Sequence, residues 1–381
     1  MEFDKRKKIT IDFWLIGIVV ILMFFGLLML ANATGFPDSP EGSNWLQYFA
    51  DMDKSSIGRH SLWFGLGCVL AVIVAWFDYK LYGELSIFLY ALSLIMLLAV
   101  VIFGTDNYGQ KRLEITESIE VQPSEVSKIA LIVTLAWDLS KKERGIQKIG
   151  ELILVLVKVM IPLVLILMQP DLGTALVYIF ITAVLLIASG TNKILLGLLT
   201  ASGVIAVIPM WNLVFNESQK TRILTFLDPS LDPLGSGYNV IHSKTAIGSG
   251  QMLGKGFFNP SALSQLNYIP VQESDFIFAV TGETLGFWWT SLIIIVFAAL
   301  ILRMMILARR TPDKFGSYLI IGVAAMMFFH IFENVGMSIG IMPVTGIPLP
   351  FFSYGGSSMI TNMIGIGLVE GVYLRHKRRR V

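Results

Sequence analysis

The stretch IDFWLIGIVVILMFFGLLMLANA at residues 11–33 decides the class of fold. A helix of about 20 apolar residues is long enough to cross the hydrocarbon core of a bilayer. Four basic residues at positions 5–8 precede the stretch, as they do in a signal peptide. The stretch is too long for the apolar region of a signal peptide, and no A-x-A-like cleavage site ends it. We therefore expect a retained membrane span.

Nine further segments carry the same apolar character. They cover residues 60–78, 81–103, 124–138, 149–168, 172–190, 192–215, 275–307, 315–343 and 356–374. The composition agrees, because 55% of the residues are hydrophobic, only 15% are charged and the mean hydropathy is +0.71. A soluble domain carries about 25% charged residues. We predict an all-α integral membrane protein with about ten transmembrane helices, forming a single polytopic domain over residues 1–381.

The basic residues predict the orientation. They cluster at the N-terminus, between spans four and five (Lys141, Lys142, Arg144, Lys148), between spans eight and nine (Arg309, Arg310, Lys314) and in the tail 375–380. Basic residues collect on the cytoplasmic side of membrane proteins. Ten spans place all four clusters on that side, whereas an odd number would separate the two ends. Both termini are therefore expected in the cytoplasm, with the connections 34–59 and 104–123 outside.

Several classes of protein are excluded by what the sequence lacks. The net charge of +2 gives no electrostatic footprint for nucleic acid. Cys68 is the single cysteine, so neither an intrachain disulfide nor a cysteine-based metal site can form. The chain has no Walker A motif, no G-x-G-x-x-G and no H-E-x-x-H. Any chemistry must come from carboxylates, basic groups and loop backbone at the membrane face.

One connection is much longer than the others. Residues 216–274 form a large extracytoplasmic loop between spans seven and eight, with turn signals at Asp228-Pro229, Asp232-Pro233 and Gly235-Ser236-Gly237. Long ordered loops are usually functional. Because this loop is rich in Ile, Leu, Phe and Tyr, we expect a partly helical structure that lies on the membrane.

Ionisable residues inside spans are costly and mark functional candidates. Glu125 and Lys128 lie three residues apart, which places them on one helix face as an ion pair. They are either a structural clasp or part of a site. Lys158 has no evident local partner. Further buried polar candidates, most of them expected to join helices, are Glu283, Glu333, Asn334 and Glu370.

Asp275 directly follows the long loop and opens span eight. It has two interpretations, which can both hold. Its carboxylate can cap the free N–H groups of the helix, or it can face a cavity at the membrane–water boundary.

Motifs along residues 110–360 resemble the SEDS family, which includes RodA and FtsW. They are Gln122-Pro123-Ser124-Glu125-Val126-Ser127-Lys128, Gln169-Pro170-Asp171-Leu172-Gly173-Thr174, the loop segments 228–238 and 246–256, Asp275-Phe276-Ile277-Phe278-Ala279, and the Gly- and Pro-rich stretch 343–358. Their order and number make the resemblance specific, and it covers nearly the whole chain. Two departures stand out. Val271, Glu273 and Ser274 replace the family's usual Glu, His and Thr before the aspartate, and Leu113 replaces a Trp after Lys111-Arg112.

The resemblance implies a peptidoglycan glycosyltransferase of the bacterial cytoplasmic membrane. Such enzymes polymerise lipid II on the outer face and work beside a class B penicillin-binding protein, a transpeptidase. The family's catalytic aspartate aligns with Asp275, which we expect to act as the general base in a displacement that inverts the anomeric centre. The short terminal tails favour a RodA-like role in cell-wall elongation and cell shape over division or sporulation.

The leaving pyrophosphate needs cations or N–H donors. The candidates in outer connections are Lys111, Arg112, Arg222, Lys244 and Lys255, each of which could instead be a solvated loop cation. We expect Glu125, Lys128, Asp171, Thr345 and Ser353 to support the cavity. The segment 343–358 either lines that cavity or only reverses the chain. No cofactor is predicted. Mg²⁺ or Mn²⁺ would suit a pyrophosphate, but no ligand cluster indicates either.

Two other functions fit the same spans. A lipid II flippase would need buried polar groups through the whole membrane depth, whereas here the motifs crowd the outer face. A scaffold that only recruits the transpeptidase would leave Asp275 dispensable.

Overall fold

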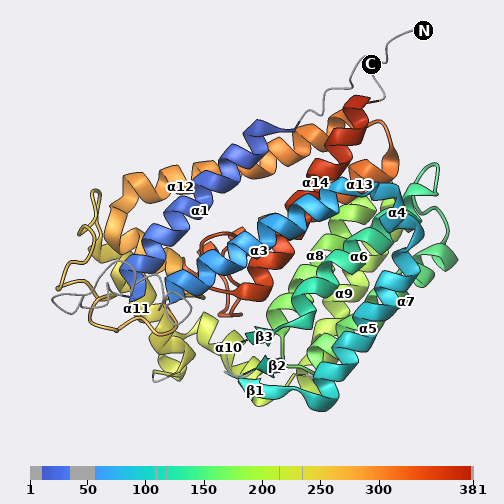
Figure 1. Ribbon diagram of the computed structural model, residues 1–381. Helices are drawn as coiled ribbons and strands as arrows, with labels where there is room; N and C mark the ends of the chain where they lie inside the picture. The colour runs from blue at the N-terminus through green and yellow to red at the C-terminus, as the bar shows by residue number, and fades with distance from the viewer. Residues whose placement is uncertain are drawn as a thin grey trace, which may run out of the picture.

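The computed structural model describes residues 11–34, 56–107, 110–116, 119–213, 215–233 and 235–378. Each of the ten predicted segments coincides with a helix (Figure 1). These helices are α1 (Phe13–Thr34), α3 (Ser56–Trp76), α5 (Ser86–Phe103), α6 (Pro123–Ser140), α7 (Ile149–Leu167), α8 (Leu172–Ala188), α9 (Lys193–Leu213), α12 (Ile277–Arg310), α13 (Lys314–Ile339) and α14 (Gly356–Arg378). The prediction of an all-α, multi-pass membrane protein is confirmed.

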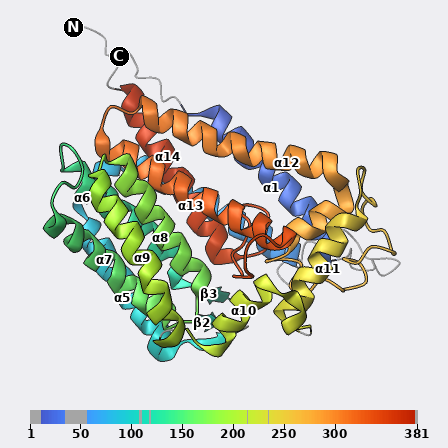
Figure 2. The ribbon, with the colours of Figure 1, turned by 180° about the vertical axis from the view of Figure 1, so that it is seen from behind.

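The helices differ in how much of their surface lies inside the protein. Seven of the described helices are long and apolar enough to cross a membrane: α1, α3, α5, α7, α9, α12 and α13. In α13, 72% of the most apolar window is buried, against 6% in α9. The remaining three, α6, α8 and α14, are shorter or more polar, and they pack among the others (Figures 1 and 2). α6 and α14 are more polar than the seven, whereas α8 is apolar but has only 17 residues.

Small residues allow the first and last parts of the chain to pack closely. A Cβ atom on Gly367 of α14 would lie 2.6 Å from the carbonyl oxygen of Ala71 on α3. Such close approach of backbones is typical of helix pairs in membranes, where dispersion replaces the hydrophobic effect as the main attraction. The packing therefore joins segments nearly 300 residues apart in sequence.

One end of the bundle gathers the basic connections. The N–H of Asp12, just before α1, donates to Glu370 Oε2 on α14 (3.2 Å), and Arg303 of α12 forms an ion pair with the Asp12 carboxylate. Lys314 Nζ donates to the carbonyl of Glu143 at 2.8 Å. The ends of α1, α6, α12 and α14 thus meet on one side, as ten crossings require. The basic run 5–8 lies outside the described residues.

Short elements occupy the opposite end. The loop 216–274 contains α10 (Glu217–Leu227), the 3-10 helix η1 (Pro229–Leu231) and α11 (Ser236–Ser249), followed by turns. Asp228 accepts hydrogen bonds from the N–H (3.0 Å) and hydroxyl (2.6 Å) of Ser230, which lowers the pKa of its carboxyl. On the basic side, α4 (Tyr79–Glu84) is a short helix before α5.

A small antiparallel sheet was not predicted. Its strands β1 (Thr105–Asn107), β2 (Gln110–Thr116) and β3 (Ile119–Val121) lie in the order β1-β2-β3 in the connection after α5. β1 and β3 have only three residues each, too few for a clear alternating pattern, although β2 has seven. β3 runs directly into α6.

α12 is kinked near its N-terminal end. Gly286 has φ +71° and ψ −173°, which breaks the helix between residues 277–285 and the membrane-spanning remainder. A Cβ at this position would lie 2.2 Å from the backbone nitrogen of Gly254, so only glycine fits. The loop after α11 occupies the inside of the kink.

Candidate active site

Asp275 lies two residues before α12, at the end of the bundle that carries the long loop. The helix N-cap is Phe276, whose side chain offers no capping oxygen, so Asp275 stands before the cap. Its carboxylate is partly exposed, and Oδ1 accepts a hydrogen bond from the Ser274 hydroxyl at 2.8 Å. The Asp275 N–H donates to the Val271 carbonyl at 3.1 Å. The carboxylate is thus carried on a tight turn directly before α12.

The backbone around Asp275 is fixed from two sides. Asn334 of α13 donates from Nδ2 to the carbonyls of Asp275 (2.9 Å) and Ile347 (2.8 Å). From the stretch 343–358, Ser353 donates to the Ser274 carbonyl at 2.5 Å, and the Tyr354 N–H donates to the Glu273 carbonyl at 2.8 Å. The Gly- and Pro-rich stretch therefore supports the turn that carries Asp275.

Ser353 and Thr345, two of the predicted cavity-supporting residues, have different partners. The Ser353 hydroxyl also accepts from the Leu349 N–H at 2.8 Å, which stabilises the reversal of the chain. Thr345 donates to Glu333 Oε1 at 3.0 Å, and both residues are fully buried. Ser353 thus touches the Asp275 turn, while Thr345 lies deeper and joins the stretch to α13.

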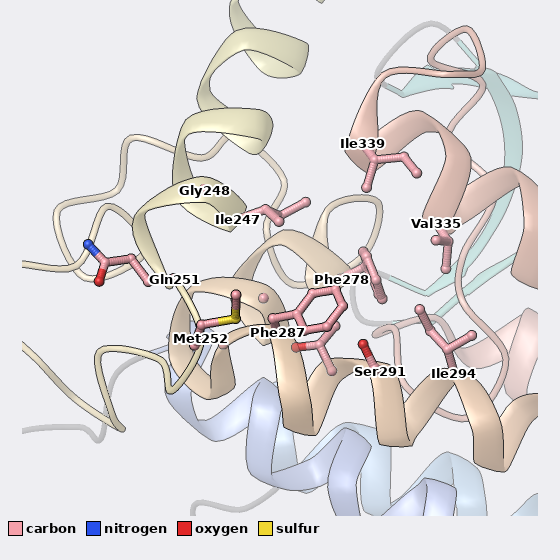
Figure 3. Close-up of a pocket in the computed structure, with 13 residues that line it drawn as sticks. Ile247, Gly248, Gln251, Met252, Phe278, Phe287, Ser291, Ile294, Val335 and Ile339 are labelled. Carbon is pink, nitrogen blue, oxygen red and sulfur yellow. The ribbon is translucent and has the colours of Figure 1, made fainter.

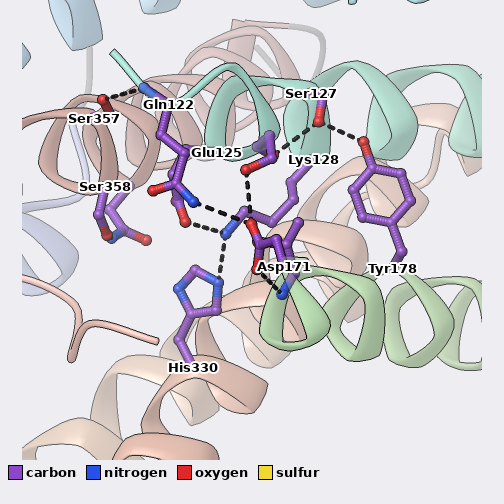
Figure 4. A network of polar contacts seen from close by, with 12 residues as sticks. Gln122, Glu125, Ser127, Lys128, Asp171, Tyr178, His330, Ser357 and Ser358 are labelled. Carbon is purple, nitrogen blue, oxygen red and sulfur yellow. Dashed lines mark hydrogen bonds and ion pairs between the residues drawn. The ribbon is translucent and has the colours of Figure 1, made fainter. Parts of the chain in front are cut away.

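The predicted ion pair between Glu125 and Lys128 is present. Lys128 Nζ donates to Glu125 Oε1 at 2.7 Å and lies 2.9 Å from His330 Nε2 on α13 (Figure 4). Because an ammonium group only donates, His330 Nε2 accepts. The side chains of Glu125 and Lys128 are 5% and 1% exposed. This cluster crosslinks α6 and α13 inside the protein.

Asp171 joins the same interior network. Its carboxylate caps α8 by accepting from the Thr174 N–H at 2.9 Å. It also accepts from the Ser124 hydroxyl and the Gln122 side-chain amide, both at 3.0 Å. Gln122 in turn donates its N–H to Ser357 at 3.0 Å (Figure 4). Asp171 therefore links α6, α8 and the start of α14.

The predicted basic residues separate into groups. Lys111 and Arg112 lie on β2, paired with Asp106 and Thr105 of β1, and their side chains lie outside the described part of the molecule. Arg222 is half-buried on α10. These three belong to the outer end, but the structure does not join them to Asp275.

Lys244 and Lys255 both have neighbours within the protein. Lys244 lies on α11 against Gly340, which is the C-cap of α13 and has a left-handed conformation. A cation is stabilised there because the C-terminal end of the helix dipole is negative. Lys255 Nζ forms an ion pair with Glu283 Oε1 at 2.8 Å. The Lys255 ammonium is therefore neutralised by a carboxylate, which favours a structural role over binding a pyrophosphate.

Arg59 is a basic residue near the turn that the sequence prediction did not name. It lies at the outer end of α3, with its guanidinium carbon 5.9 Å from the ring centroid of Tyr354. The N–H of Tyr354 is the group that holds the Glu273 carbonyl. The sequence held a signal for Arg59, because it is the last residue of the connection 34–59. The other basic candidates were predicted from their positions in connections of the same side.

An open apolar cavity of about 580 Å³ adjoins the N-terminal half of α12 (Figure 3). It is lined by the end of α11 and the residues after it, both halves of the kinked α12 and the end of α13, through Ile247, Met252, Phe278, Phe287, Val335 and Ile339. Phe278 lies three residues after Asp275, and Val335 follows Asn334. The space suited to hydrocarbon is therefore lined by residues that lie close in the chain to Asp275 and Asn334.

Metal-binding residues do not gather in the part of the chain that the structure describes. No group of three or more His, Cys, Asp or Glu side chains is placed to hold an ion there. The prediction about divalent cations stays a prediction.

The helical bundle and the motif positions define a class of multi-pass membrane proteins with a site at one membrane face. The family model described as "Cell cycle protein", for FtsW, RodA and SpoVE, matches residues 12–378. The chain belongs to this family, as its motifs predict.

Relatives of known name or structure match nearly the whole chain. The peptidoglycan glycosyltransferase MrdB of Escherichia coli K12 is 33% identical over 373 residues, which cover 97% of this chain and 95% of the relative. A chain of a peptidoglycan synthase complex that coordinates polymerization and crosslinking is 28% identical, with a TM-score of 0.78 over 97% of this chain and 99% of its own. RodA of Thermus thermophilus is 26% identical, with a TM-score of 0.69 over 96% of this chain and 98% of its own.

Proposed function

We propose that this protein is a peptidoglycan glycosyltransferase that polymerises lipid II on the outer face of the bacterial cytoplasmic membrane, with Asp275 as the general base. The observation that carries the site assignment is the turn at Asp275. It combines a partly exposed carboxylate, a backbone held by Asn334 and Ser353, and an adjoining apolar cavity. The membership of the family and the names of its members support the reaction class.

The reaction joins two lipid-linked disaccharides. The 4-hydroxyl of GlcNAc on one substrate attacks the anomeric carbon of MurNAc on the other. As the new glycosidic bond forms, the bond to the undecaprenyl pyrophosphate breaks, and the hydroxyl proton passes to Asp275. A positioned base contributes about 10²–10⁴-fold to such a step. A single displacement inverts an α-linked donor to a β-linked glycan and needs no second, nucleophilic carboxylate.

The negative charge that grows on the leaving pyrophosphate needs cations. Arg59 reaches the Asp275 turn through Tyr354, whose N–H donates to the Glu273 carbonyl, and is proposed as the principal candidate. Lys111 and Arg112 on β2, Arg222 on α10 and Lys244 on α11 lie at the same end and are proposed as secondary candidates. Lys255 is assigned to the ion pair with Glu283 instead.

The isoprenoid tail needs a hydrocarbon environment next to the reacting sugars. The cavity beside α12 offers it, because its lining is mostly aliphatic and aromatic. The tail passes from bilayer hydrocarbon into an apolar cavity, so this transfer gains little hydrophobic free energy, and the cavity would serve to orient the donor. The loop 216–274 covers this region and would act as a lid.

The distribution of charges supports an outward-facing site. The basic connections that contain Lys142, Arg309 and Lys314 lie at the end opposite to Asp275. Basic connections favour the cytoplasm, which supports a position of Asp275 on the outer face, where lipid II is consumed. A class B penicillin-binding protein that crosslinks the product is the proposed partner, in keeping with the synthase complex that this fold resembles. The likeness to RodA of Thermus thermophilus, a rod shape determining protein, supports a role in cell-wall elongation and cell shape.

A polymerisation assay tests the proposal. The protein is purified with its cognate penicillin-binding protein, and labelled lipid II is supplied to the wild type and to Asp275→Ala. We expect a glycan ladder from the wild type only, with both proteins monodisperse. A ladder from both would refute the role of Asp275. No ladder from either, beside an active control polymerase, would favour the flippase, and lipid translocation in vesicles would then be measured.

A further inference from the structure

Glu283 is a fully buried carboxylate on the outer half of α12, eight residues after Asp275. Its oxygens accept hydrogen bonds from the N–H groups of Leu263 (2.7 Å) and Ser264 (3.0 Å) and from Lys255 Nζ (2.8 Å). The Ser249 hydroxyl donates to it at 3.2 Å. One side chain thus holds three separate points of the long loop.

The backbone of the loop is bonded to the same half of α12. The Lys255 N–H donates to the Glu283 carbonyl (2.9 Å), and the Gly256 N–H donates to the Thr284 carbonyl (3.0 Å). Beyond the kink, the Phe287 N–H donates to the Gln251 carbonyl at 2.8 Å. The kink leaves these backbone N–H and carbonyl groups without partners inside the helix, and the loop forms hydrogen bonds with them instead. The loop and the N-terminal part of α12 are therefore joined as one unit.

A short path of contacts connects Glu283 with Asp275. Ser264, whose N–H is bonded to Glu283, accepts at its carbonyl from Gln272 Nε2 at 3.0 Å. The same Gln272 amide donates to the Ala33 carbonyl at the end of α1 (2.8 Å). Gln272 lies three residues before Asp275, so the place of Ser264 sets where the Asp275 turn begins.

We infer that Glu283, neutralised by Lys255, is a positioning residue for Asp275. It fixes the loop residues 263 and 264 and, through Gln272, the turn that presents the base to the substrate. This inference rests on the proposed function of Asp275. It gives Lys255 a structural task, in place of the substrate-binding role that its location in an outer connection had indicated.

The direct test is Glu283→Gln in the polymerisation assay. One carboxylate oxygen of Glu283 accepts from the Leu263 N–H and the other from the Ser264 N–H. The amide nitrogen of Gln replaces one of these acceptors in either orientation, so at least one loop contact is lost while the volume of the side chain stays. A misplaced catalytic group costs about 10²-fold in rate for a shift of about 1 Å. We expect kcat to fall about 10- to 100-fold with KM for lipid II within about twofold. An unchanged kcat would overturn the inference.

Glu217→Gln is the matched control. Glu217 also pairs with a lysine, Lys220, at 3.0 Å, but its side chain is 90% exposed on α10. The same chemical change there should leave kcat and KM at wild-type values. A loss equal to that of Glu283→Gln would show that any charge change in the loop lowers activity, and the inference would fall.

Lys255→Met separates positioning from substrate binding. If Lys255 serves Glu283, kcat falls and KM stays near the wild-type value. The double variant Glu283→Gln/Lys255→Met then loses less than the product of the two single effects, because the residues act as a unit. A raised KM with unchanged kcat would make Lys255 an anion-binding residue and overturn the inference.

Two measurements keep this test independent of the proposed function. Wild type and Asp275→Ala are assayed alongside, so that a failure of Asp275 as base is seen by itself. Amide hydrogen exchange of residues 249–264 is followed in the wild type and in Glu283→Gln, whatever the activity. Faster exchange in the variant supports the inference, since local opening reports lost contacts. Unchanged exchange overturns it.

Discussion

The ion pair between Glu125 and Lys128 gives the sharpest prediction about stability. Lys128→Met keeps most of the side-chain volume but leaves the Glu125 carboxylate buried, with 5% of its side chain exposed. Removing one partner of a buried pair costs about 3–5 kcal/mol. For a chain of this size, 1 kcal/mol corresponds to about 1–2 °C in Tm, so we expect Tm to fall by about 3–10 °C.

The double variant Glu125→Gln/Lys128→Met separates the two interpretations of this pair. It removes both charges, and replacing a whole buried pair by neutral groups is often close to neutral. We therefore expect most of the lost stability to return. Tm is measured in detergent from the intrinsic fluorescence of the 8 tryptophans. A Tm for Lys128→Met within about 1 °C of wild type, or a double variant less stable than either single one, would refute the reasoning.

Activity then decides whether the clasp is only structural. A double variant that is stable and polymerises lipid II at the wild-type rate makes Glu125 and Lys128 a clasp between α6 and α13. A stable but inactive double variant assigns them a part in the reaction, as their motif implies.

Three further changes probe the site and its surroundings. Gly248 lines the cavity, and no atom lies within 4 Å of a Cβ there, so Gly248→Leu should occupy the cavity and raise KM for lipid II several-fold. Gly203 on α9 has equally free space but does not line the cavity, so the control Gly203→Leu should leave KM unchanged. Gly286→Ala meets both positive φ and a backbone clash, so we expect a loss of at least about 2 kcal/mol in stability, seen as a lower Tm and early proteolysis of the loop. Ser353→Ala leaves the Ser274 carbonyl and a buried N–H unsatisfied at a cost of about 1–3 kcal/mol; wild-type kcat and Tm in this variant would contradict its role in holding the turn.

The positions of the spans were predictable because lipid imposes a simple rule. A run of apolar residues must close its own hydrogen bonds as a helix, and the predicted bounds of residues 149–168 match α7 within one residue. The short segment 124–138 was the weakest prediction, yet α6 is among the most buried helices. Its polar residues contact other helices rather than lipid, and hydropathy does not show which of the two surrounds a helix.

The partners of the polar residues were predictable only where they are local. Spacing alone predicted the pair of Glu125 and Lys128. Lys158 had no evident partner, yet its Nζ lies 2.5 Å from Asp138 on the preceding helix. Lys255 meets Glu283 because α12 kinks and the loop folds back. Contacts of this kind depend on tertiary packing, which no spacing along the chain encodes.

The contacts of the first helices, α1 and α3, with α12 and α14 have a consequence for how the protein is assembled in the membrane. Asp12 finds its partners on α12 and α14, and α3 packs against α14. α12 and α14 are synthesised after α1 and α3, so α1 and α3 leave the ribosome before these neighbours exist. Until then, Asp12 and the buried His60 of α3 face lipid, water or the insertion machinery. The contacts of Asp12 are therefore completed only once α14 has been made.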